Sequence, residues 1–226
     1  MHTAAALALS LAALLAHVAP QGAPPAPLLS LGPVSPAAAA LFAGRPRIEV
    51  AGLVHKTAGG QVILLQVELA EGLGGPRLQL VEGQPVDEHE VIALIPGLAA
   101  ASAPRAHAET ALLPGEAERV GQSADGVWVA RLDEELVLHL DLHALDEDGQ
   151  PERAASRSQA LGRGASHDAL PVIEWAGDLD EDGALDLIID SGSTAGGPQR
   201  RRLWSSGAAL DGDLVGLRAE GEPSGC

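Results

Sequence analysis

Residues 136–145 read LVLHLDLHAL, and this stretch decides the fold class. Leucine occupies every second position at its start, while His139, Asp141 and His143 stand at positions between the leucines. Successive side chains of a β-strand point to opposite faces of the sheet. The alternation therefore predicts a strand with one face on a hydrophobic core and a second face that is mostly polar.

On both sides of this strand, short apolar runs alternate with clusters of Gly, Pro and Asp, a spacing typical of strands and turns. No stretch keeps a helical period for twelve residues with caps at both ends, so helix is expected only as one turn within 37–44 and as a turn or two within 99–111 or 156–161. The predicted fold class is all-β, with antiparallel sheets packed as a sandwich or partial barrel. The expected strands are 47–50, 61–69, 77–81, 91–95, 126–132, 136–145, 171–175, 185–189, 202–205 and 214–217.

The composition excludes two classes of partner. The 226 residues include 14 Lys and Arg against 31 Asp and Glu, a formal charge of −17. Binding of nucleic acid or of an anionic membrane surface needs clustered basic side chains, and the sequence is strongly acidic with no basic stripe. Aromatic residues make up only 2% of the chain, so its core is expected to be aliphatic.

The amino-terminal part carries no charge before Arg45. Its apolar run at 4–16 has the length of a signal-peptide core and is too short to span a bilayer. We expect a signal peptide at 1–19, a flexible Pro- and Ala-rich spacer at 20–46 and a β-rich domain at 47–226. The protein would then be secreted, periplasmic or on the cell surface, with no membrane insertion of the mature chain; an uncleaved anchor or a wrong start codon is the alternative.

Cys226 is the only cysteine and the last residue, which rules out a disulfide within one chain. It could link two chains, or it could be an incidental residue of a disordered tail. Without an internal disulfide, a bound metal ion is the obvious candidate for additional stabilisation of an exported protein. Heavy use of Ala, Gly, Pro and Arg, with one Lys, is typical of a GC-rich bacterial genome.

An acidic loop within GDLDEDGALDLIID (177–190) carries the clearest chemistry. Asp178, Asp180, Asp182 and Asp186 fall at positions 1, 3, 5 and 9 of the loop, and Gly183 falls at position 6. Alternate residues of a tight loop turn their carboxylates inward, and a glycine lets the chain reverse. Hard oxygen ligands in this number favour Ca²⁺ over Zn²⁺ and Mg²⁺. The alternative is a solvated acidic turn.

Position 12 of the loop is Ile189 where an EF-hand has Glu, and strands are expected on both sides. The segment resembles the calcium-binding loop of FG-GAP and VCBS repeats, with 203–207 standing where their next short strand would be. The resemblance implies that the ligands are Asp178, Asp180, Asp182, the Ala184 carbonyl and Asp186. It covers about 171–217 in a single copy, so we expect a strand-loop-strand calcium unit attached to another β-fold, without the functions of a propeller.

Two other functions compete with an exported calcium-binding protein of binding or structural role. His139, Asp141 and His143 could ligate a catalytic Zn²⁺ in a secreted hydrolase, although the polar outer face of an amphipathic strand is the commoner explanation for such a set. The sequence contains no nucleophile elbow, HExxH motif or phosphate loop, so no catalytic residue is predicted. A surface or assembly component, cross-linked through Cys226, is the third hypothesis; no protein or glycan partner is identified.

Overall fold

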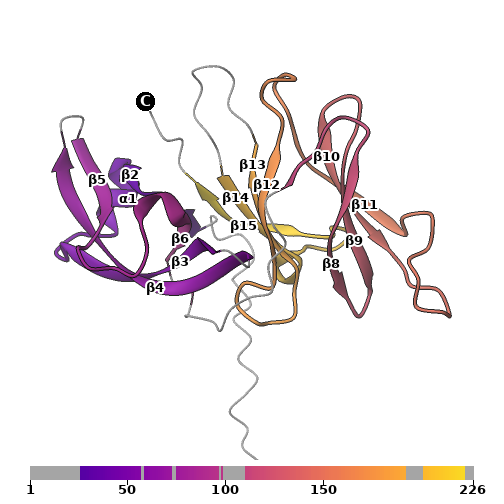
Figure 1. Ribbon diagram of the computed structural model, residues 1–226, viewed down its shortest axis with the longest axis horizontal. Helices are drawn as coiled ribbons and strands as arrows, with labels where there is room; N and C mark the ends of the chain where they lie inside the picture. Colours follow the sequence, from indigo (N-terminus) through magenta and orange to yellow (C-terminus); the bar gives the residue numbers. More distant parts are fainter. Residues whose placement is uncertain are drawn as a thin grey trace, which may run out of the picture.

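The computed structural model describes residues 26–56, 59–72, 75–96, 98, 110–191 and 201–221. Its strands form three sheets (Figure 1). We call them the amino-terminal sheet, in the order β2-β5-β4-β3-β6; the central sheet, in the order β1-β15-β14-β13-β12-β7; and the outer sheet, in the order β11-β10-β9-β8. All pairings are antiparallel except that of β1 with β15. The predicted all-β class with antiparallel sheets is confirmed.

The strands of the amino-terminal sheet are β2 (Gly32–Pro33), β3 (Arg47–Lys56), β4 (Gly59–Gly72), β5 (Gly75–Leu80) and β6 (Val91–Ile95). The central sheet contains β1 (Ala26–Leu28), β7 (Thr110–Ala111), β12 (Val172–Gly177), β13 (Asp186–Asp190), β14 (Arg201–Ser205) and β15 (Gly216–Gly221). The outer sheet contains β8 (Ala117–Ser123), β9 (Gly126–Leu132), β10 (Val137–His143) and β11 (Arg157–Arg163). Within the described ranges, helix is limited to α1 (Pro36–Ala40) and the 3-10 turns η1 (Glu88–Glu90) and η2 (Ser206–Ala208).

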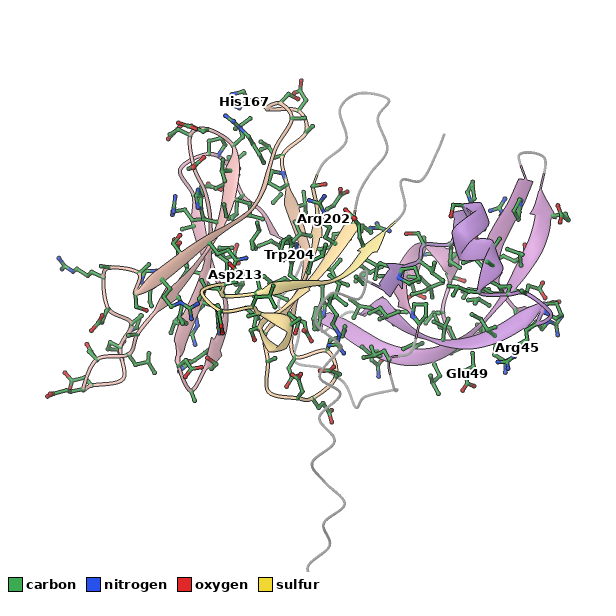
Figure 2. All side chains as sticks on the ribbon, turned by 180° about the vertical axis from the view of Figure 1, so that it is seen from behind. Arg45, Glu49, His167, Arg202, Trp204 and Asp213 are labelled. Carbon is green, nitrogen blue, oxygen red and sulfur yellow. The ribbon has the colours of Figure 1, made fainter. Side chains whose placement is uncertain are left out.

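The central sheet packs on both of its faces, which explains its most apolar strand. All five residues of β13 are buried. Leu187 and Ile189 join a hydrophobic cluster with the outer sheet, whereas Ile188 joins Trp175 in a cluster with the amino-terminal sheet. Trp204 of β14 packs against the first cluster, at the middle of the molecule (Figure 2). A strand covered on both faces needs a continuous apolar run, and β13 supplies one between its two terminal aspartates.

The strand from which the sequence analysis started is β10. Leu138, Leu140 and Leu142 are buried in the cluster between the outer and central sheets, as the alternation predicts. Leu136 precedes the strand and has a φ of 64°, so it belongs to the turn that follows β9. One face of β10 is therefore core.

The expectation of a flexible spacer at 20–46 is wrong for residues 26–46, because these residues belong to the fold. β1 extends the central sheet, and α1 packs inside the curl of the amino-terminal sheet, where Phe42 just beyond it is buried (Figure 1). Ser35 caps the helix by accepting a hydrogen bond from the Ala38 amide at 3.2 Å. The β-rich domain therefore includes residues before 47, and the single helical turn expected within 37–44 is present.

Two further local expectations differ from the structure. Residues 156–161, considered for a helical turn, lie largely in β11, the edge strand of the outer sheet. Strand β8, the opposite edge, was not predicted, because only Val120 of its seven residues is buried. The predicted signal peptide at 1–19 and Cys226 lie outside the described residues.

Candidate metal centre

The acidic loop joins β12 to β13 at residues 178–185, within the central sheet. Its first aspartate organises the turn: Asp178 accepts hydrogen bonds from the amides of Asp182 (3.1 Å) and Gly183 (2.9 Å) through its two carboxylate oxygens. Glu181 and Gly183 both have left-handed φ values, 59° and 83°. A glycine adopts that conformation without the cost that a Cβ imposes, which is the role predicted for Gly183.

The loop is anchored to the sheet on two sides. Leu179 at its second position is fully buried in the cluster between the central and amino-terminal sheets. At the loop exit, the amide of Leu185 donates to Ser206 Oγ at 2.8 Å, and the amide of Ser206 donates to the Leu185 carbonyl at 2.8 Å. The acidic side chains are therefore held on a loop with fixed ends.

Three of the four predicted carboxylate ligands come together. Asp178, Asp180 and Asp186 each offer an oxygen within 4.8 Å of the others, and these three form the only such group that could hold a metal ion in the described part of the chain. Asp182 is not in this group; its Oδ1 accepts the amide of Ala184 at 2.7 Å. The assignments of Asp182 and of the Ala184 carbonyl as ligands stay predictions.

The donor set fits a hard cation. Asp186 is 0% exposed, and its Oδ2 accepts the amide of Leu179 at 2.9 Å. The remaining oxygen, Asp186 Oδ1, has no hydrogen-bond donor, and the same is true of the buried Asp180 Oδ1. A buried carboxylate oxygen without a partner is costly, and a bound cation would remove that cost. The candidate ligand atoms of this group are all carboxylate oxygens, which suit Ca²⁺, Mg²⁺ or Mn²⁺ better than Zn²⁺.

The environment of Asp186 changes its acidity. Burial raises the pKa of Asp186 to about 6, and the neighbouring charge of Asp180 acts in the same direction. Hydrogen bonds from Ser205 and from the Leu179 amide, together with the charge of Arg218, lower this pKa but do not offset the loss of solvation. The site therefore contains a carboxylate whose negative charge is poorly compensated by the protein.

Among the described residues, a single cationic side chain reaches the aspartates, and no sequence motif indicated it. Arg218 of β15 places Nη2 2.6 Å from Asp180 Oδ2 and Nη1 4.0 Å from Asp186 Oδ1. Burial alone would lower the pKa of Arg218, but the hydrogen bond to Asp180 and the charges of the loop aspartates raise it. Arg218 lies more than thirty residues beyond the loop, so only the pairing of β14 with β15 brings it here.

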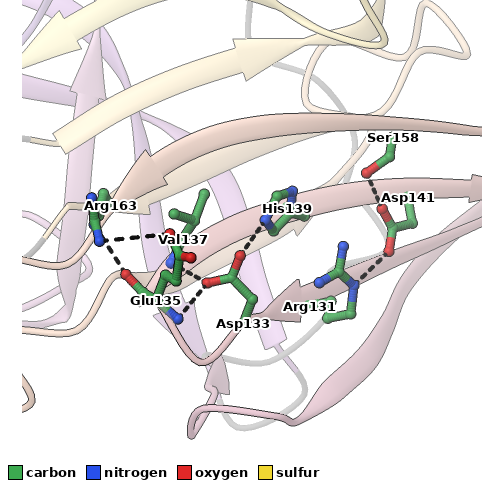
Figure 3. A network of polar contacts seen from close by, with 8 residues as sticks. All are labelled: Arg131, Asp133, Glu135, Val137, His139, Asp141, Ser158 and Arg163. Atoms are coloured by element: carbon green, nitrogen blue, oxygen red, sulfur yellow. Dashed lines mark hydrogen bonds and ion pairs between the residues drawn. The ribbon is translucent and has the colours of Figure 1, made fainter.

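The alternative zinc site on β10 is occupied by other interactions (Figure 3). His139 Nε2 lies 2.8 Å from Asp133 Oδ2. The pKa of the Asp133 carboxyl is lowered, mainly by the hydrogen bond from the Val137 amide and to a smaller extent by His139. Asp141 is bound by Arg131 Nε at 3.0 Å and by the hydroxyl of Ser158. Each side chain thus has its own partner within the outer sheet.

The third residue of that set, His143, uses Nδ1 to contact the Glu152 carbonyl at 2.9 Å. His139, Asp141 and His143 do not form a metal-binding group in the described residues. The polar face of an amphipathic strand accounts for all three.

A pocket of about 680 Å³ lies beside the acidic loop, between the central and outer sheets. Its walls include Trp128 of β9, Arg119 and Gly121 of β8, and Asp178 and Gly183 of the loop. The Trp128 indole donates to Ser123 Oγ at 3.3 Å, which fixes the ring in the wall. Asp178 therefore belongs both to the acidic loop and to the wall of this pocket.

The chain matches no protein-family model, no curated protein and no solved structure in comparisons with known proteins. The resemblance to FG-GAP and VCBS repeats therefore rests on the loop motif alone. No helix in the described ranges is long and apolar enough to cross a membrane.

Proposed function

We propose that this chain is an exported, β-rich calcium-binding protein, with a binding or structural role, in which one Ca²⁺ stabilises the D-x-D-x-D-G-x-x-D loop. The observation that carries the proposal is the convergence of Asp178, Asp180 and Asp186, two of which contribute a buried carboxylate oxygen that has no hydrogen-bond donor. An acidic surface turn would leave such oxygens in water. The buried position of Asp186 is what separates this loop from such a turn.

Calcium is the cation that we favour among the hard ions. Its coordination shell takes six to eight oxygens in flexible geometry, whereas Mg²⁺ demands an octahedron and keeps several waters. Asp182 and the Ala184 carbonyl, at positions 5 and 7 of the motif, could complete such a shell with water. The left-handed residues Glu181 and Gly183 support this reading, because they bend the backbone around the three aspartates.

The position of the acidic loop suggests how a bound ion would stabilise the protein. The loop connects β12 to β13, and these strands contribute to both hydrophobic clusters that flank the central sheet. Neutralising the aspartates would remove repulsion at the centre of the fold. We expect an affinity on the order of 10⁻⁶ to 10⁻³ M. Millimolar extracellular calcium would fill such a site, which agrees with the proposed export.

Thermal unfolding in EGTA, Mg²⁺ and Ca²⁺ tests the proposal. A ligand at about 100 times its Kd stabilises a protein by about 2.7 kcal/mol, which raises the Tm of a chain of this size by about 5 to 10 °C. We expect a rise of that order in Ca²⁺ and a smaller one in Mg²⁺. Asp178→Asn should abolish the calcium-dependent rise.

Asp146→Asn is the matched control. Asp146 also caps a tight acidic turn, accepting the amides of Asp148 (3.0 Å) and Gln150 (2.8 Å), but it lies in no metal-binding group of the described residues. It should keep the full response to Ca²⁺. Equal melting temperatures in EGTA and Ca²⁺ for the wild type would refute the proposed function.

A further inference from the structure

Arg218 owes its position to an irregularity in the central sheet. In the β14–β15 ladder Leu203 pairs with Ala219, and the next residue, Trp204, pairs with Leu217, so Arg218 has no residue opposite it. Such a β-bulge re-aims the side chain of the extra residue. Here the guanidinium reaches the aspartates of the acidic loop.

The guanidinium contacts two of the three carboxylates that a metal ion would need. It lies 2.6 Å from Asp180 Oδ2 and 4.0 Å from Asp186 Oδ1, and its side chain is about two-thirds buried. Two cations cannot share these oxygens at such distances without strong repulsion, since the site is largely withdrawn from water. Arg218 in this position therefore opposes the binding of a metal ion to Asp180 and Asp186.

We propose that Arg218 is a built-in competitor of the metal ion, which neutralises Asp180 and Asp186 when calcium is scarce and is displaced when calcium binds. This inference rests on the proposed function, because it concerns the same site. The exchange conserves the ligands: the two carboxylates release one guanidinium and accept one Ca²⁺, and Arg218, at the partly exposed edge of the site, turns to solvent.

The exchange has two consequences of opposite sign. In the absence of calcium, Arg218 supplies the only positive charge that the described residues bring to these aspartates, so its loss should destabilise the protein. In the presence of calcium, Arg218 must be displaced, so its loss should strengthen binding. A purely structural arginine would give the first effect without the second.

Isothermal titration of the metal-free full chain with CaCl₂ separates these cases, using Arg218→Gln and Arg202→Gln. Arg202 is the matched control: it lies one strand away on β14, pairs with Glu220 at 2.9 Å, and its replacement changes the net charge equally (Figure 2). We expect the calcium Kd of Arg218→Gln to fall by at least about tenfold, equivalent to about 1.4 kcal/mol. The Kd of Arg202→Gln should stay within about twofold of wild type.

Melting temperatures in EGTA provide the second measurement, and Arg218→Lys guards against misfolding. Arg218→Gln should melt below the wild type in EGTA and show a larger rise on adding Ca²⁺. Arg218→Lys keeps the charge and should retain a Kd near the wild-type value.

The outcomes distinguish this inference from the proposed function. If neither wild type nor Arg218→Gln binds calcium, the proposed function fails. If both bind with equal Kd, or if Arg202→Gln gains as much affinity as Arg218→Gln, competition by Arg218 is refuted while calcium binding stands. Binding by Arg218→Gln alone would refute calcium binding by the native chain, and with it the displacement of Arg218 by calcium.

Discussion

Replacement of Asp186 by asparagine makes a prediction whose sign depends on pH and on calcium. The folded protein raises the pKa of Asp186 to about 6 by burying its carboxylate, so folding favours the protonated form. The stabilisation from this group is therefore fully present below the unfolded pKa of 3.8 and is lost as the pH rises through about 6. Asparagine mimics the uncharged form at every pH.

The magnitude follows from the two pKa values. A tenfold change in a protonation equilibrium is worth about 1.4 kcal/mol, so the gap between 3.8 and about 6 corresponds to about 3 kcal/mol. In EGTA, Asp186→Asn should match the wild type near pH 4 and exceed its free energy of unfolding at pH 7.5 by up to this amount. The difference between the two proteins cancels groups that titrate equally in both.

Urea denaturation from pH 4 to pH 8 provides the measurement, first in EGTA and then in saturating Ca²⁺. With calcium the order at pH 7.5 should reverse, because the wild-type carboxylate binds the ion and the carboxamide binds it poorly. Parallel stability curves for the two proteins in EGTA would refute the reasoning, since they would mean that the ionised Asp186 carries no burial cost.

Three further substitutions test separate parts of the structure. Gly183→Ala should lower the free energy of unfolding by about 1 kcal/mol, because an alanine at a φ of 83° is strained although no atom lies within 4 Å of its Cβ. An unchanged urea midpoint would contradict the left-handed backbone conformation at residue 183. Gly60→Ala should lower the free energy of unfolding by about 1 to 3 kcal/mol and shift tryptophan fluorescence, because its Cβ would lie 2.5 Å from the Trp175 ring. If the variant is as stable as the wild type, the Trp175 ring does not pack against residue 60. His139→Ala removes a partly exposed hydrogen-bonded contact with Asp133 and should cost at most about 1 kcal/mol without changing the metal content measured by elemental analysis. Loss of a bound zinc would support the hydrolase alternative.

Much of the fold could be predicted from apolar periodicity, and the exceptions share a cause. Strands that cover a core, such as β9 and β10, carry alternating or continuous apolar residues and were located closely. Edge strands β8 and β11 bury one residue each, so their sequences lack the pattern. The Pro-rich composition of 26–46, which is uncharged before Arg45, suggested a spacer, but the sheets bury Leu28, Leu29 and Phe42 of this segment.

The candidate site was predictable in its local part only. Loop spacing within a dozen residues sufficed to bring Asp178, Asp180 and Asp186 together and to require a left-handed Gly183. Arg218 carried no signal, because a bulge in a distant ladder aims it at the loop. The sequence also could not reveal that His139 is paired with Asp133, since that contact depends on the hairpin between β9 and β10.

Titration of the metal-free wild-type chain with CaCl₂ in a calorimeter is the most direct test of the central claim. We predict one Ca²⁺ per chain, with a Kd between about 10⁻⁶ and 10⁻³ M, and no binding by Asp178→Asn. Absence of saturable binding by the wild type at millimolar calcium, or equal binding by Asp178→Asn, would contradict it.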